Sequence, residues 1–111
     1  MNSPTAEQAD NFHRYVLHWQ KLLNLNSWRI EKSKKKAPRD AMACVVIDSD
    51  ARLAAYRLGD FGSAEITERT LSETALHEVL HVFLYDLKHS SNDEAIEHEV
   101  INVLEKLLME L

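Results

Sequence analysis

Apolar residues follow a helical period in three segments of this chain. From Thr5 to about Leu25 they recur every three or four residues, which places them on one stripe of a helix that packs against a core. Two later segments, about Leu71 to Lys88 and about Asp93 to Leu111, repeat the pattern. The short polar sequence HSSND between them favours a turn and a helix cap. We therefore expect the last two helices to pack antiparallel.

Between the first two helices the pattern is typical of strands. In SWRIEKS, Trp28 and Ile30 alternate with polar residues. MACVVID is a continuous run rich in β-branched residues, and ARLAAYRL is a further strand candidate. The cluster Asp48-Ser49-Asp50 favours a turn, so these last two strands are expected to form a β-hairpin.

The order of these segments predicts an α+β fold. It comprises an N-terminal helix, a small antiparallel or mixed sheet of about three short strands, and two antiparallel helices. Thr70, followed three residues later by Glu73, has the form of a capping box at the start of the second helix.

Composition narrows the class of protein. A chain of 111 residues that is 45% hydrophobic and 28% charged fits one small globular domain, residues 1–111. Cys44 is the only cysteine, which excludes an internal disulfide and a four-cysteine zinc site and favours a reducing compartment. The N-terminus lacks the layout of a signal peptide, and no apolar run reaches the length of about 18 to 20 residues that spans a bilayer. We therefore expect a cytoplasmic protein with no membrane partner.

Charge gives a weaker indication of partners. The net charge of −5 argues against a protein whose main partner is a nucleic acid. Basic residues nevertheless crowd into RIEKSKKKAPR, from Arg29 to Arg39. Charged residues around Pro38 between two strands need no partner, so we interpret this run as a solvated loop.

The second helix contains the sequence ALHEVLHVF, which carries candidate chemistry. His77 and His81 are four residues apart and so lie on one face of the helix, where two imidazoles can converge on one metal ion. Glu78 directly follows the first histidine. In such a motif zinc is a Lewis acid that activates a water, and the glutamate takes the proton of that water and passes it to the leaving amine. The spacing alone also fits an ordinary helix with two histidines, so a third ligand is needed.

The third ligand is expected on the last helix, about as far after the turn as His81 lies before it. A rotation of about 100° per residue centres the apolar side of this helix near Val100 and Leu111. Glu97 lies close to that centre, and an inward glutamate beside two histidines is costly to bury unless a metal compensates it. Asp93 also points inward, but it sits at the turn, where we interpret it as a helix cap. The remaining candidates in this helix point away from the centre: His98, Glu99, Glu105 and Glu110.

With these residues the chain resembles the zincin metallopeptidases, and more narrowly a minimal gluzincin-like domain. In that family H-E-x-x-H on one helix is joined by a glutamate on a following helix, and here the likeness is carried by His77, Glu78, His81 and Glu97 in EAIEHEVINVLE. The order of elements is also similar to that of small stand-alone zincin domains, some of them encoded by phages and mobile elements. The resemblance implies a zincin-like fold and a zinc metallopeptidase that acts on a peptide or protein substrate.

The chain also departs from related families. The later positions of the metzincin motif are Leu84 and Leu87, which excludes that class. A third histidine ligand, as in SprT-like proteins, would have to be His89 or His98. The aspartate that gluzincins often carry four residues after the ligand glutamate is here Ile101, which leaves the residues that orient the histidines unassigned.

The resemblance further implies a substrate cleft. ARLAAYRL would be an edge strand that pairs with an extended peptide, and Tyr56 or Tyr85 would donate a hydrogen bond to the oxyanion formed during cleavage. Three hypotheses follow: a zinc peptidase, a zincin-fold module that binds zinc without efficient turnover, and a metal-free domain that binds a protein or nucleic acid through its basic loop and helical faces. Two histidines and a carboxylate also bind iron in oxygenases, but Glu78 within the motif favours zinc hydrolysis.

Overall fold

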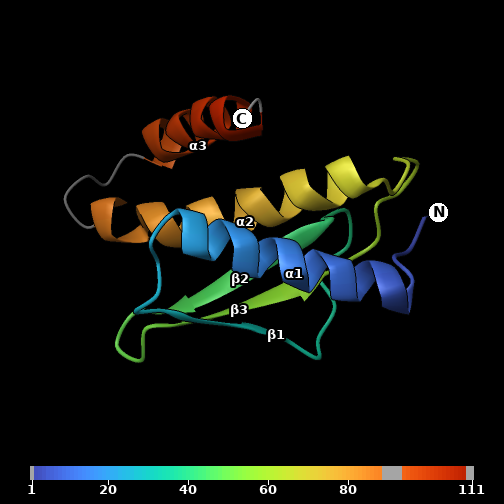
Figure 1. The fold of residues 1–111 in the computed structure, drawn as a ribbon, viewed down its shortest axis with the longest axis horizontal. Helices are drawn as coiled ribbons and strands as arrows, with labels where there is room; N and C mark the ends of the chain where they lie inside the picture. The colour runs from blue at the N-terminus through green and yellow to red at the C-terminus, as the bar shows by residue number, and fades with distance from the viewer. Residues whose placement is uncertain (1, 89–93, 110–111) are drawn as a thin grey trace.

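The structure, a computed structural model, describes residues 2–88 and 94–109, without the side chains of residues 86–88, 94–97, 99, 100, 103 and 107. The α+β class predicted from the sequence is confirmed (Figure 1). The elements in chain order are α1 (Ala6–Leu22), β1 (Arg29–Lys32), β2 (Ala43–Asp48), β3 (Leu53–Leu58), α2 (Glu68–Lys88) and α3 (Glu94–Met109).

The three strands form one mixed sheet in the order β1-β3-β2. The predicted hairpin of β2 and β3 is confirmed, since these strands are antiparallel, whereas β1 lies parallel to β3. β3 is therefore the central strand, and the expectation that ARLAAYRL forms an edge was wrong. Ala54 and Tyr56 of this central strand are at most 1% exposed, whereas Val46 of the edge strand β2 is 50% exposed.

Helices α1 and α2 cover one face of the sheet, and α3 packs antiparallel against α2 (Figure 1). The core lies between the two helices and the sheet, where Phe12 and Val16 of α1 meet Leu76 and Leu80 of α2, all at most 1% exposed. Burial of such side chains is the main stabilising contribution to a small domain. Among the described residues, no helix combines the length and the apolar composition that a membrane span requires.

The start of α2 differs from the prediction. The backbone N–H of Thr67 donates to the Thr70 hydroxyl at 2.8 Å, and the N–H of Thr70 donates to the Thr67 hydroxyl at 3.1 Å. Thr67 is thus the residue that caps the helix, which begins at Glu68. The predicted capping box of Thr70 with Glu73 was wrong, because Glu73 pairs with Arg69 at 2.8 Å instead.

Candidate metal centre

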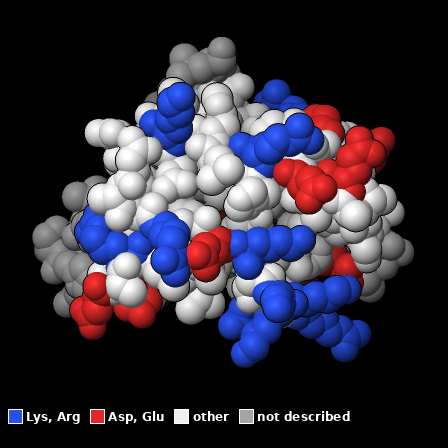
Figure 2. All heavy atoms as spheres, turned by 60° about the horizontal axis from the view of Figure 1, so that its bottom comes forward, with Lys and Arg blue, Asp and Glu red and all other residues white. Residues whose placement is uncertain are grey.

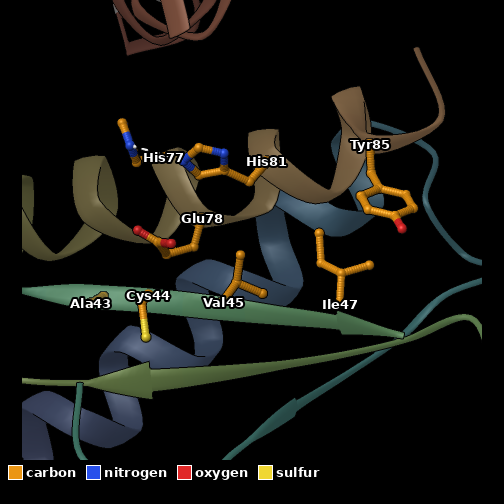
Figure 3. A pocket seen from close by; sticks show the side chains of 8 residues that line it. All are labelled: Ala43, Cys44, Val45, Ile47, His77, Glu78, His81 and Tyr85. Atoms are coloured by element: carbon orange, nitrogen blue, oxygen red, sulfur yellow. Dashed lines mark hydrogen bonds between the residues drawn. The ribbon is translucent and has the colours of Figure 1, made fainter. Parts of the chain in front are cut away.

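His77 and His81 project from α2 on the side that faces α3, one helical turn apart (Figure 3). Their Nε2 atoms are 3.3 Å apart, and their rings meet edge to face with centroids 4.9 Å apart. Two nitrogens bound tetrahedrally to one zinc ion at 2.0–2.1 Å are about 3.3 Å apart. The two imidazoles therefore have the spacing that a shared zinc ion requires.

Glu105 of α3 orients the first of these histidines. Its Oε2 lies 3.0 Å from Nδ1 of His77, and the two side chains are only 24% and 34% exposed. When neutral His77 donates from Nδ1 to this carboxylate, its Nε2 keeps the lone pair that a metal needs and faces His81. A carboxylate bonded to the outer nitrogen is a common way of fixing the tautomer of a metal-binding histidine.

The predicted rotation of the last helix was therefore wrong. The prediction turned Glu105 and His98 away from the apolar side, but Glu105 contacts His77, and the ring of His98 lies 5.4 Å from that of His81. Ile101, between them in sequence, is fully buried. The prediction took the inward side of the helix from the positions of its apolar residues alone. In the structure, the side of α3 that faces α2 also carries polar residues that contact the histidines.

The predicted third ligand lies outside what the structure describes. Glu97 belongs to α3, but its side chain is not described, and His89 lies outside the described residues altogether. Among the side chains that are described, no group of three or more His, Cys, Asp or Glu is arranged to hold a metal. The assignment of Glu97 as a ligand therefore stays a prediction.

Glu78 points from α2 towards β2, on a different side of the helix from the histidines (Figure 3). It is only 7% exposed, and this burial raises the pKa of the carboxyl group from 4.5 to about 7. The charge of His77 lowers this pKa, and that of Glu105 raises it. A carboxyl group with a pKa near neutral pH is suited to accept and return a proton during a reaction.

A cleft of about 430 Å³ runs between α2 and β2 and brings these side chains together. Among the described strands β2 pairs with β3 alone, so the other side of its backbone can pair with an extended peptide. Figure 3 shows Tyr85 at one end of the cleft, above Ile47. The lining residues are Ala43, Cys44, Val45, Ile47, His77, Glu78, His81 and Tyr85.

The two tyrosines considered as oxyanion donors lie in different places. Tyr85 lines the cleft, four residues after His81. Tyr56 is 1% exposed and lies under α1, where its hydroxyl is 2.8 Å from Nδ1 of His13. Burial raises the pKa of Tyr56 as well. Tyr56 is therefore a core residue, and Tyr85 is the remaining candidate.

Comparison of this chain with known protein families, with curated proteins and with solved structures found no match. The interpretation of the metal centre therefore depends on the geometry of this chain and on general chemistry.

Proposed function

We propose that this protein is a zinc-dependent peptidase in which His77, His81 and Glu97 hold the metal and Glu78 is the general base. The proposal depends most on one observation, the 3.3 Å separation of the two histidine Nε2 atoms. When bound, zinc supplies a Lewis acid that polarises the scissile carbonyl and acidifies water.

Each residue of the cleft has a separate task in this proposal. Glu105 accepts a hydrogen bond from Nδ1 of His77, which orients that imidazole and leaves its Nε2 for the metal. Glu78 takes a proton from the attacking water and delivers it to the leaving amine, which a pKa near neutrality favours in both directions. The unpaired edge of β2 holds the substrate backbone extended, and Tyr85 donates to the carbonyl oxygen as negative charge develops there.

A second candidate is a module that binds zinc without efficient turnover. The size of the cleft favours it, since about 430 Å³ is at the small end of the range of about 300–1,000 Å³ that ligand sites occupy. The two candidates share the metal centre and differ in whether Glu78 transfers a proton.

Metal analysis and peptide cleavage test both candidates. Protein purified without chelator should contain one equivalent of zinc, and His81→Ala should lose it. Glu78→Gln should keep the zinc but cleave no member of a mixed peptide pool, because an amide does not accept the proton. A wild-type protein that binds no added zinc would refute both candidates. Zinc binding without any cleavage favours the second candidate, and full activity of Glu78→Gln would refute the general-base role.

A further inference from the structure

A basic hollow lies at the β1 edge of the sheet, opposite the edge that borders the cleft. It has a volume of about 230 Å³ and lies where the loop after β1 meets the chain segment that precedes α1. Asp60 is the only acidic residue among the described residues that line it. Its basic residues are Lys32, Lys34, Lys35 and Lys36.

Charge is strongly segregated along this chain. Residues 29–39 contain six of the 13 Lys and Arg residues and one of the 18 Asp and Glu residues, so their net charge is +5 and that of the remaining chain is −10. Figure 2 shows Lys and Arg side chains gathered on the side of the molecule that lies at the bottom of Figure 1. The protein therefore has a compact basic patch despite its net charge of −5, and the electrostatic potential at this face is not given by the net charge.

Backbone hydrogen bonds hold the basic loop at both ends. The N–H of Ser33 donates to the carbonyl of Tyr56 at 2.8 Å, and the N–H of Gly59 donates to the carbonyl of Met42 at 2.7 Å. Only glycine permits the second contact, because a Cβ at Gly59 would lie 2.3 Å from the carbonyl oxygen of Ala41. The lysines thus project from an ordered backbone, which lowers the entropy lost when they bind a ligand.

Most of the positive charge in the patch is not neutralised by neighbours. Within the described part of the chain, the one ion pair of the four lysines joins Lys36 Nζ to Asp60 Oδ1 at 3.9 Å, and Asp60 also accepts a hydrogen bond from Ser3. The Lys36 side chain remains 78% exposed. In β1, by contrast, Arg29 forms an ion pair with Glu31 at 2.7 Å.

The surroundings of the hollow favour phosphate groups over lipids or exposed bases. None of the exposed large hydrophobic side chains of the described residues lines it, so it has no apolar anchor for a membrane and no aromatic ring on which a base can stack. A duplex carries one negative charge for about every 1.7 Å of its axis, twice the density of one strand. We propose that this basic patch binds the phosphate backbone of double-stranded nucleic acid without reading its sequence.

The number of lysines sets the expected dependence on salt. Each phosphate contact contributes a slope of about −0.9 to the logarithm of affinity against the logarithm of salt concentration. Four lysine contacts give a slope of about −3.6. An increase from about 50 to about 200 mM salt should therefore weaken binding by about 150-fold.

Fluorescence anisotropy with a labelled DNA duplex two helical turns long tests this proposal on the whole protein. The double variant Lys34→Gln/Lys35→Gln loses two contacts, so the same change in salt should weaken its binding by only about 12-fold. Lys21→Gln/Lys106→Gln is the matched control, because it removes the same charge from two exposed positions outside the patch. The affinity of the control for the duplex should depend on salt concentration as that of the wild type does.

Three outcomes would overturn the proposal. Equal weakening by the two double variants would mean that net charge alone governs binding. Binding of phosphatidylserine vesicles without binding of the duplex would assign the patch to a membrane surface. If single-stranded DNA bound as tightly as the duplex, the higher charge density of the duplex could not explain binding, and the preference for double-stranded nucleic acid would be refuted. Because the patch and the metal centre use different residues, none of these results bears on the proposed peptidase.

Discussion

Replacing Glu78 by Gln is expected to stabilise the metal-free protein while it abolishes cleavage. The side chain is 7% exposed, and burial raises the pKa of its carboxyl group from 4.5 to about 7. The folded protein therefore holds this proton more tightly than the unfolded chain does. The corresponding stability is fully present below pH of about 4.5 and is lost as the pH rises to about 7. Glutamine has a similar shape and does not ionise, so the variant avoids this loss.

The size of the effect follows from the two pKa values. Their separation of about 2.5 units, at about 1.4 kcal/mol per unit, corresponds to a free energy of about 3 kcal/mol. The gain from Glu78→Gln in the free energy of unfolding should stay below about 1 kcal/mol near pH 5 and reach about 3 kcal/mol near pH 8. Added zinc should reduce this gain, because a nearby cation stabilises the ionised carboxylate.

Urea unfolding in the presence of a chelator measures this difference. The fluorescence of Trp19 and Trp28, which are 6% and 4% exposed, reports the transition. Glu73→Gln is the matched control, because it also removes a carboxylate from α2, but one that is 35% exposed and paired with Arg69. For the control, the change in the free energy of unfolding relative to the wild type should not rise comparably with pH. A gain for Glu78→Gln that is equal at the two pH values, or a loss near pH 8, would refute the reasoning.

Three further predictions concern the same site. Glu105→Gln should weaken zinc affinity by about 10- to 100-fold, because the first histidine loses the carboxylate that orients it, whereas Glu73→Gln should not; equal affinities by calorimetry would exclude this role. Tyr85→Phe should lower kcat for peptide cleavage, whereas Tyr56→Phe, which removes a buried hydrogen bond, should lower Tm and leave kcat of the folded protein unchanged; the reverse pattern in kcat would contradict the role of Tyr85 as the oxyanion donor. Zinc affinity should fall as the solution is made acidic, because protons compete with the metal for both imidazoles. Competition titrations with a metal-binding dye measure this fall, and an affinity independent of pH would contradict ligation by histidine.

The helices, the strands and the hairpin could be predicted because they depend on local periodicity and turn residues. The sheet order could not, since β1 pairs with β3 through contacts such as Arg29 with Leu53, which are distant in sequence. The continuous apolar run in β2 is also typical of a central strand, yet β2 is an edge strand on which Val46 is half exposed. Packing of the whole chain, and not the strand itself, decides which strand is central.

The histidine pair could be predicted because a spacing of four residues fixes one helical face in any tertiary context. Glu105 could not, because its role depends on how α3 is rotated about its axis, and a change of one residue turns a different set of side chains towards α2. Glu105 lies seven residues after His98, so the sequence does place these two on one side of the helix. The sequence does not show which side of α3 contacts α2, and that contact gives Glu105 its role.

Helix α3 is joined to the rest of the molecule mainly through α2, whereas α2 is enclosed by α1, the sheet and α3. Leu76 and Leu80, on either side of the first histidine, are fully buried. Amide protons in this part of α2 should therefore exchange with deuterium only on global unfolding, while α3 should open as a separate unit at a lower free energy. Each opening carries Glu105 away from His77, and a metal held by both helices would oppose it. Amide exchange in α3 thus tests, without any substrate, whether the two helices hold a metal.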